Sequence, residues 1–204
     1  MSVRVKICGV TSAADAAMVV AAGADMIGLN FFARSKRFLS AKAAREVVAE
    51  IPPEVMRVGV FVNSSRSEIE EIRQALGLAM IQLHGDESPE LLRGWPCPVV
   101  RAVRVGAAED VTAALASSQA DYYLLDGPAG AAYGGAGVGF EWDHARSVPR
   151  EKCIVAGGLR PETVGAAVRE LSPFAVDVAS GVESSPGIKD AVATAEFVEN
   201  AKSA

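Results

Sequence analysis

Short apolar runs alternate along the chain with longer segments whose apolar residues have helical spacing, at roughly one pair per 25 residues. This alternation is typical of strand–helix units that build a parallel sheet. The eight runs that we predict as strands span residues 3–8, 26–30, 58–62, 80–83, 99–103, 122–125, 154–156 and 175–178.

Helical segments follow these runs and start at residues that favour helix N-termini. The predicted starts are Thr11-Ser12, Ser40, Ser65, and positions near 86–88, 108–110, 142–143, 161–163 and 187–188. Eight such units without a second pattern predict an α/β protein whose residues 1–204 form a single-domain (β/α)8 TIM barrel of minimal decoration. An open, doubly wound sheet is the alternative.

Alternation along the predicted strands divides their residues between the helix side and the barrel interior. Strand alternation predicts that an unusual number of polar side chains point into the barrel. Burying Lys6 and Asp177 unpaired would be costly, and the first and eighth strands of a closed barrel are neighbours, so we expect these two residues to pair. The residues predicted to point inward are Arg4, Lys6, Cys8, Asn30, Gln82, His84, Asp126 and Asp177.

The composition of the chain limits the kinds of protein, partner and cellular location that we expect. The chain has 204 residues, half of them hydrophobic, which suffices for one core. A net charge of −5 without a Lys/Arg cluster argues against a nucleic-acid partner. The longest apolar run, 16–24, is too short for a membrane span, and the N-terminus lacks the apolar stretch of a signal peptide, so we expect a cytoplasmic location. The three cysteines, Cys8, Cys97 and Cys153, form no Cys-x-x-Cys pair and indicate neither disulfides nor zinc.

Several segments, in order and at suitable spacing, resemble the phosphoribosylanthranilate isomerase family of tryptophan biosynthesis. Any one of them is weak evidence, but the set extends from the first predicted strand to the last. It comprises Lys6-Ile7-Cys8-Gly9, Ser35-Lys36-Arg37, the residues 58–62, Gln82-Leu83-His84-Gly85, Leu125-Asp126, residues 134–137 with 140–142, 156–159, and 177–183.

The resemblance implies an Amadori rearrangement of the aminoaldose N-(5′-phosphoribosyl)anthranilate to an aminoketose, without a cofactor or a metal. This reaction needs an acid that protonates the ribose ring oxygen and a base that removes the C2′ proton. The resemblance assigns the acid to Asp126 and the base to Cys8. Asp126 must then hold a proton and Cys8 must lose one, and Lys6 is a source of positive potential that favours the thiolate. The alternatives are a buried small hydrophobe for Cys8 and a turn residue for Asp126.

Two glycine-containing segments after the last two strands suit a sugar phosphate, because glycines leave backbone N–H groups accessible. These segments are Gly157-Gly158 and Ser180-Gly181. A tight strand-to-helix turn is the alternative for Gly157-Gly158. Ala179 stands where the family commonly has Ser, so a side-chain contact from that position is in doubt while the backbone donors remain.

The anthranilate carboxylate requires a cation, and Arg37 occupies the position at which the family binds that group. His84 is a candidate substrate contact, with a histidine held by hydrogen bonds as the alternative. Asp177 has two compatible interpretations: an ion pair with Lys6, and a role in orienting the substrate or Arg37. The Gly-rich segment 127–139, in which Ala136 replaces a common Thr, is interpreted as a lid, with a disordered loop as the alternative.

Three other classes of protein share parts of this sequence pattern and are the alternatives. A histidine-pathway aminoaldose isomerase or a dual-substrate relative tends to use two aspartates for the protons, and Cys8 argues against it. A non-catalytic barrel should lack one of the two proton-transfer residues, and no Gly-x-Gly-x-x-Gly follows the first strand to support a nicotinamide-binding fold. We therefore expect a small-molecule sugar-phosphate substrate, no nucleic acid or membrane partner, and a monomer or a homodimer.

Overall fold

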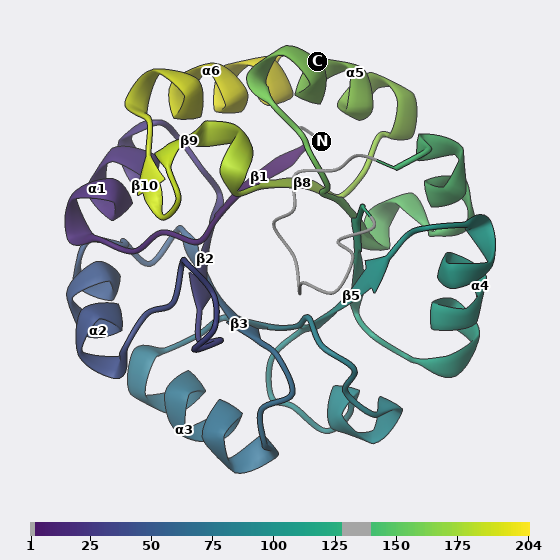
Figure 1. Ribbon diagram of the computed structural model, residues 1–204, viewed down its shortest axis with the longest axis horizontal. Coiled ribbons are helices and arrows are strands. Elements are labelled where there is room, and N and C mark those ends of the chain that lie inside the picture. The colour runs from purple at the N-terminus through teal and green to yellow at the C-terminus, as the bar shows by residue number, and fades with distance from the viewer. Residues whose placement is uncertain (1–2, 128–139) are drawn as a thin grey trace.

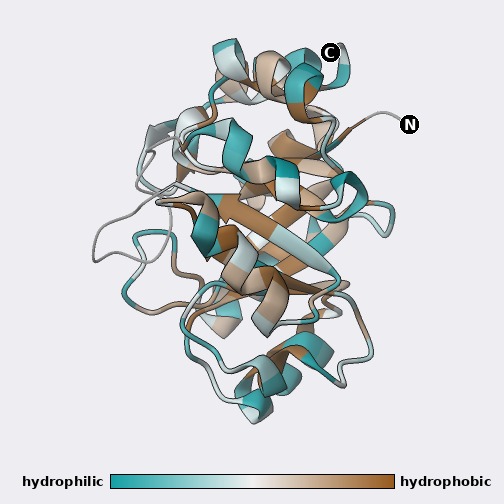
Figure 2. Ribbon diagram, turned by 90° about the vertical axis from the view of Figure 1, so that its right-hand side faces the viewer, coloured by the Kyte–Doolittle hydropathy of each residue, from teal (hydrophilic) through white to brown (hydrophobic). Residues whose placement is uncertain are grey.

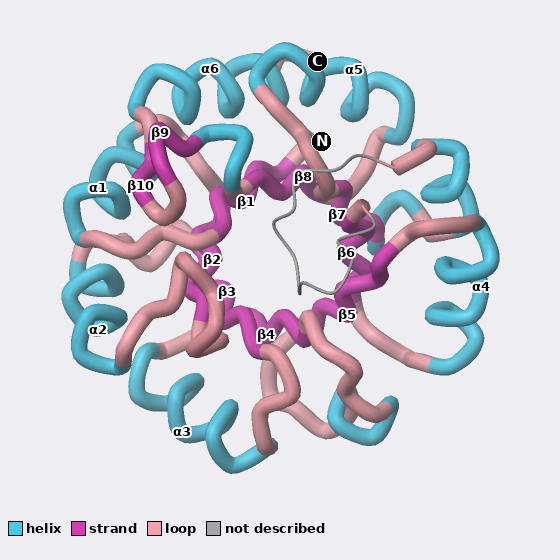
Figure 3. The backbone as a smooth tube through the Cα atoms, viewed as in Figure 1, coloured by secondary structure: helices cyan, strands magenta, loops and turns pink. Residues whose placement is uncertain are grey.

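The computed structural model of the chain describes residues 3–127 and 140–204. Eight parallel strands close into a barrel in chain order, with the helices outside (Figures 1 and 3). The strands are β1 Arg4–Cys8, β2 Met26–Asn30, β3 Met56–Phe61, β4 Met80–Leu83, β5 Val99–Arg104, β6 Tyr122–Asp126, β7 Cys153–Val155 and β8 Ala175–Val178. The predicted barrel is confirmed, and the open doubly wound sheet is excluded because β1 pairs with both β2 and β8.

Polar caps start several helices where the sequence predicts them. The Ser12 side chain accepts a hydrogen bond from the Asp15 N–H at 3.0 Å, and Ser65 forms a reciprocal capping box with Glu68. Gly77 ends α3 in the left-handed conformation at φ 59°. Six α-helices lie in the described part of the chain: α1 Ala13–Ala21, α2 Ala41–Ala49, α3 Arg66–Leu76, α4 Ala108–Ser117, α5 Pro161–Leu171 and α6 Ala191–Lys202.

Two of the eight predicted α-helices are wrong. In the described residues, the predicted helix starts near 86–88 and 142–143 lead into the short 3-10 helices η1 Pro89–Leu92 and η2 Trp142–Ser147 instead of α-helices. The segment after η1 turns at Gly94, with φ 71°, and carries Pro96 and Pro98, so the backbone there has no room for an α-helix before β5. A further 3-10 helix, η3 Arg150–Lys152, follows η2 directly.

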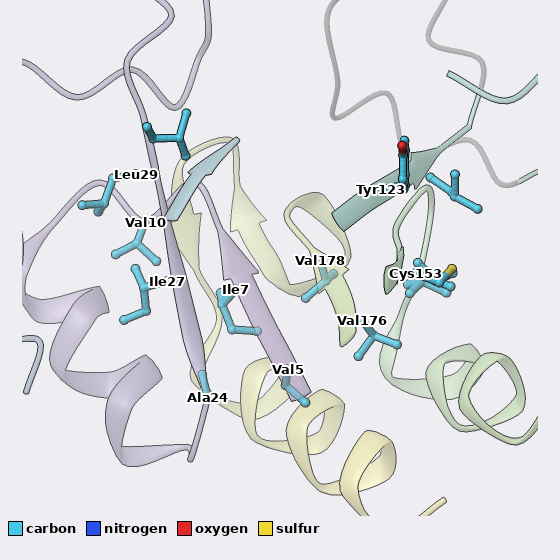
Figure 4. Close-up of a cluster of buried hydrophobic side chains, with 14 of the residues drawn as sticks. Val5, Ile7, Val10, Ala24, Ile27, Leu29, Tyr123, Cys153, Val176 and Val178 are labelled. Carbon is cyan, nitrogen blue, oxygen red and sulfur yellow. The ribbon is translucent and has the colours of Figure 1, made fainter. Parts of the chain in front are cut away.

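Buried apolar side chains form two clusters on opposite sides of the barrel wall, as strand alternation requires. The outer cluster packs strands against helices: Figure 4 shows Val5 and Ile7 of β1 with Ile27 and Leu29 of β2. Apolar residues accordingly concentrate on the central strands in Figure 2. The inner cluster fills much of the interior, which is less polar than the sequence suggests; it consists of Met26, Val58, Met80, Val100, Leu124, Ile154, Ala156 and Ala175.

A small hairpin follows the last strand of the barrel. Strands β9 Glu183–Ser185 and β10 Ile188–Lys189 pair antiparallel after the short 3-10 helix η4 Ser180–Val182. The sequence predicts only a loop at residues 184–187, because three-residue strands carry too little pattern to be recognised. No helix within the described residues combines the length and the apolar character that crossing a bilayer requires.

Candidate active site

The carboxyl ends of the barrel strands bring most of the predicted site residues to one face. Cys8 ends β1, Asp126 ends β6, and His84 follows β4 directly. This is the face at which (β/α)8 barrels carry their chemistry. We call it the barrel mouth.

Cys8 lies partly buried on the inward side of β1. A Cβ atom on the neighbouring Gly28 would come within 2.7 Å of the Cys8 Sγ, so β2 needs a glycine there to admit the thiol. Burial raises the pKa of the Cys8 thiol, and the positive charges of Lys6 and Lys189 offset only part of this effect. The predicted influence of Lys6 on the thiol is present, but the pKa still lies above its usual value, because desolvation is the larger effect.

Lys6 and Asp177 form the predicted ion pair inside the barrel. Their Nζ and Oδ1 atoms are 2.8 Å apart, and the two residues face each other in the register of β1 and β8. Burial is the largest influence and acts to lower the pKa of Lys6, but the charges of Asp177 and Cys8 and the hydrogen bonds with them together outweigh it, so the pKa lies above its usual value. The pair thus keeps a positive charge fixed beneath Cys8.

Arg37 is held by a carboxylate that the sequence analysis did not single out. Its Nε and one terminal nitrogen each donate to Glu183 at 2.7 Å. No contact with Arg37 is recorded for Asp177 among the described residues, so the carboxylate that orients Arg37 is Glu183 and not Asp177. Lys189, which is buried, donates to the same carboxylate at 2.9 Å.

Glu183 keeps its charge in this position. Burial alone would raise the pKa of its carboxyl, but hydrogen bonds from Arg37 and the charge of Lys189 bring the pKa below its usual value. Sequence reasoning overlooked both partners because charged residues after a last strand are typical of an exposed turn. Glu183 did lie in a segment that matched the family, and that was the available signal.

On the other side of the mouth, Gln82, His84 and Asp126 form a looser group. The Gln82 side-chain nitrogen lies 2.8 Å from His84 Nδ1, and His84 Nε2 lies 3.6 Å from Asp126 Oδ2. The Gly127 N–H donates to Asp126 Oδ1 at 2.9 Å. The buried Gln82 Oε1 and His84 Nε2 have no hydrogen-bond partner within the described residues. This side therefore retains polar atoms that a bound molecule can satisfy.

A small cavity of about 40 Å3 joins Asp126 to the two predicted phosphate segments. Gly157 and Gly158 both adopt left-handed φ angles, 74° and 68°, which side chains rarely tolerate. In the described residues, no hydrogen bond is recorded for either of their N–H groups. The lining residues are Asp126, Ala156, Gly157, Gly158, Leu159, Asp177, Val178, Ala179, Ser180 and Gly181; Cys8, Arg37 and His84 are not among them.

The close approach of the two glycine segments depends on Gly181, where a Cβ atom would collide with the Leu159 carbonyl oxygen. Among the described residues, no group of three or more His, Cys, Asp or Glu is arranged to hold a metal ion. The mouth thus offers a thiol, a carboxyl group, a cation and accessible backbone N–H groups. The predicted lid, 127–139, lies outside the described residues except for Gly127.

Comparison with known proteins identifies the family. The family model described as N-(5′-phosphoribosyl)anthranilate (PRA) isomerase matches residues 5–200. The chain belongs to this family. The N-(5′-phosphoribosyl)anthranilate isomerase of Myxococcus xanthus is 47% identical over all of this chain and 98% of its own length. That of Stutzerimonas stutzeri is 46% identical over 98% of each chain.

Solved structures of family members share the barrel. The isomerase of Thermotoga maritima superposes with a TM-score of 0.90 at 40% identity, covering 99% of this chain and all of the other. A family member in complex with reduced 1-(o-carboxyphenylamino)-1-deoxyribulose 5-phosphate has a TM-score of 0.85 at 38% identity, with the same coverage. These matches span the chain from the first barrel strand to the last helix.

Proposed function

We propose that the chain isomerises N-(5′-phosphoribosyl)anthranilate to 1-(o-carboxyphenylamino)-1-deoxyribulose 5-phosphate in tryptophan biosynthesis. The observation that carries the proposal is the family match over residues 5–200 together with a thiol and a carboxyl group at the ends of β1 and β6. The related structure with a reduced form of this product bound supports the substrate class.

Asp126 is the general acid of the proposed reaction. It donates a proton to the ribose ring oxygen while the anilino nitrogen pushes its electron pair toward C1′, which breaks the C1′–O bond and forms a C1′=N bond. The cavity that Asp126 shares with the glycine segments supports this role, because it places the carboxyl group beside the proposed phosphate site.

Cys8 is the general base. Its thiolate removes the C2′ proton, the electron pair forms a C1′=C2′ bond, and the nitrogen becomes an amine. The enol then becomes the ketone as C1′ takes up a proton and the C2′ hydroxyl releases one, which returns Asp126 and Cys8 to their starting protonation states. Because burial raises the pKa of the thiol, the thiolate is a minor form of Cys8 at neutral pH, and its fraction increases with pH. Lys6 and Lys189 limit that rise in pKa and so keep the thiolate accessible.

The remaining predicted residues bind the substrate. Backbone N–H groups of Gly157, Gly158, Ser180 and Gly181 hold the phosphate, which the free N–H groups of the first two support. Arg37 binds the anthranilate carboxylate with the part of its guanidinium that Glu183 leaves open. His84 contacts the substrate through Nε2, which makes no hydrogen bond within the described residues, and Asp177 lines the cavity while it pairs with Lys6.

Every group that the proposal uses comes from one barrel, so we propose that residues 1–204 act as one catalytic domain, as a monomer or a homodimer. A structure of monomers generated from the dimeric isomerase of Thermotoga maritima shows that the family includes a dimer. We place the enzyme in the cytoplasm, where a small soluble metabolite would reach it.

Turnover of the proposed substrate is the direct test. Purified protein is mixed with phosphoribosylanthranilate, and the loss of anthranilate fluorescence is followed while mass spectrometry checks that the product is an isomer. We expect saturable turnover without added metal or cofactor, unaffected by a chelator. No turnover by folded protein at any substrate concentration would overturn the proposed function.

A further inference from the structure

Lys189 is a buried lysine with an unusual set of partners at the barrel mouth. Its side chain is 0% exposed, and its Nζ donates to the Cys8 carbonyl at 2.7 Å, the Ala179 carbonyl at 3.0 Å and Glu183 Oε1 at 2.9 Å. An ammonium group has three N–H donors, so these three acceptors satisfy it completely.

The two carbonyl partners belong to the ends of different barrel strands. Cys8 is the last residue of β1, and Ala179 directly follows β8. Lys189 itself lies on β10, so one ammonium group joins the hairpin to both strand ends. The position of the Cys8 backbone, and with it the position of the thiol, therefore depends on Lys189.

The carboxylate partner extends this arrangement to Arg37. Glu183 accepts from Lys189 with Oε1 and from Arg37 with both oxygens, which fixes the plane of the guanidinium. The Arg37 side chain also packs against Gly9, where a Cβ atom would collide with the Arg37 Cδ. Cys8 and Arg37 are thus held by one set of bonds centred on Lys189.

We propose that Lys189 is a positioning residue that places Cys8 and, through Glu183, Arg37 for the same substrate. The proposal rests on the proposed function, since it assigns Arg37 to the carboxylate and Cys8 to proton removal. Lys189 does not touch the substrate. It fixes the positions of the Cys8 thiol and the Arg37 guanidinium relative to each other. A displacement of catalytic groups by about 1 Å is enough to cost enzymes on the order of 100-fold in rate.

The first experiment compares Lys189→Met with Lys202→Met. Lys202 is a matched control, because its Nζ also binds a carbonyl, that of Gly23 at 2.7 Å, and a carboxylate, that of Asp25 at 3.1 Å, but away from the mouth. We expect Lys189→Met to lower kcat/KM about tenfold or more, through both KM and kcat, and Lys202→Met to leave it unchanged. Equal activity of the two variants would overturn the proposal.

A double-mutant cycle with Arg37→Met separates positioning from general loosening of the fold. If Lys189 acts through Arg37, its removal should raise KM strongly in wild type and hardly at all in Arg37→Met. Additive effects on KM would contradict the proposal. Should Lys189→Met fail to fold, Glu183→Gln breaks the same connection while Lys189 keeps its two carbonyl partners, and the same cycle is measured with it.

A readout without substrate distinguishes failure of this inference from failure of the proposed function. In a Cys97→Ser background, the rate of Cys8 alkylation by iodoacetamide is measured against pH; Cys153 is buried with a pKa raised to about 12 and should not react. The charged groups that interact with Cys8 are Lys6, Asp177, Lys189 and Arg37. We expect Lys189→Met to shift the alkylation curve to higher pH, and an unchanged curve would overturn the placement of Cys8 by Lys189.

Discussion

The two sides of the barrel mouth are built differently. On the side of β8, β1 and the hairpin, every charged group has a partner at 2.7 to 3.0 Å; the members are Lys6, Asp177, Arg37, Glu183 and Lys189. On the side of β4 and β6, Gln82 Oε1 and His84 Nε2 have no hydrogen-bond partner within the described residues, and His84 Nε2 is 3.6 Å from Asp126 Oδ2. We call the first side complete, because its charged groups pair with one another before any substrate arrives. We call the second side incomplete, because its polar atoms gain hydrogen-bond partners only when substrate binds.

The difference follows from the cost of burying charge. An unpaired buried ammonium or carboxylate costs several kcal/mol, so the groups that position Cys8 must satisfy one another within the protein. An unpaired neutral amide or imidazole costs about 1 to 3 kcal/mol, which a substrate can return on binding. Variants on the first side should therefore damage stability, and variants on the second side should mainly damage activity.

The largest effect should come from Asp126→Asn, which keeps the shape of the side chain and removes its acidic proton. We expect kcat to fall by about 100- to 10,000-fold, the usual contribution of a general acid, with an unchanged circular dichroism spectrum. Asp143→Asn is the control, because Asp143 is exposed and pairs with Arg146 on the surface. An Asp126→Asn variant with the activity of its control would remove Asp126 from the mechanism.

The second largest effect should come from removing one partner of the buried ion pair between Lys6 and Asp177. Lys6→Met leaves Asp177 buried without a counter-charge, and we expect a loss of about 3 to 5 kcal/mol in the free energy of unfolding measured with urea. The exposed pair of Lys202 and Asp25 is the comparison, and Lys202→Met should cost about 1 kcal/mol or less. A similar small loss in both variants would contradict the account of the complete side.

A moderate effect is expected at the phosphate segment. Gly157→Ala places a Cβ on a backbone with φ 74° and should cost about 1 to 2 kcal/mol of stability. Gly94→Ala meets the same strain at φ 71° with no atom near its Cβ, so it serves as the matched control. Both should lose similar stability, but only Gly157→Ala should raise KM. A rise in KM for both would show that strain alone, without a phosphate contact, explains it.

The smallest effect on stability should come from the incomplete side. Gln82→Met removes a buried amide whose oxygen has no hydrogen-bond partner in the described part of the chain, so we expect the free energy of unfolding to change by about 1 kcal/mol or less. Activity should nevertheless fall, because His84 loses the hydrogen bond that orients its ring. A loss of stability as large as that of Lys6→Met would contradict the expectation that the two sides of the mouth differ in their contribution to stability.

The sequence predicted the parts of the molecule that depend on short-range pattern or on closure of the barrel. Alternation identified all eight strands, and closure placed β1 beside β8, which made the pair of Lys6 and Asp177 predictable. The 3-10 helices η1 and η2, found in the described residues where α-helices were predicted, were not predictable in this way, because their starts look normal.

The carboxylate that holds Arg37, and the lysine beside it, were not predicted for a different reason. Glu183 and Lys189 lie outside the barrel strands, and no periodicity reveals that a short hairpin folds back over the mouth. The pKa of Cys8 escaped as well, since its direction depends on the balance between burial and two lysines that only the packed structure defines.

The central claim is that Asp126 and Cys8 act at different steps, ring opening and proton removal from C2′. A substrate carrying deuterium at C2′ tests it most directly, through the isotope effect on kcat in Cys8→Ser and in Asp126→Asn. The account predicts a large primary isotope effect in Cys8→Ser, where proton removal limits the rate, and an effect close to unity in Asp126→Asn, where ring opening does. The reverse pattern, or equal effects in the two variants, would contradict it.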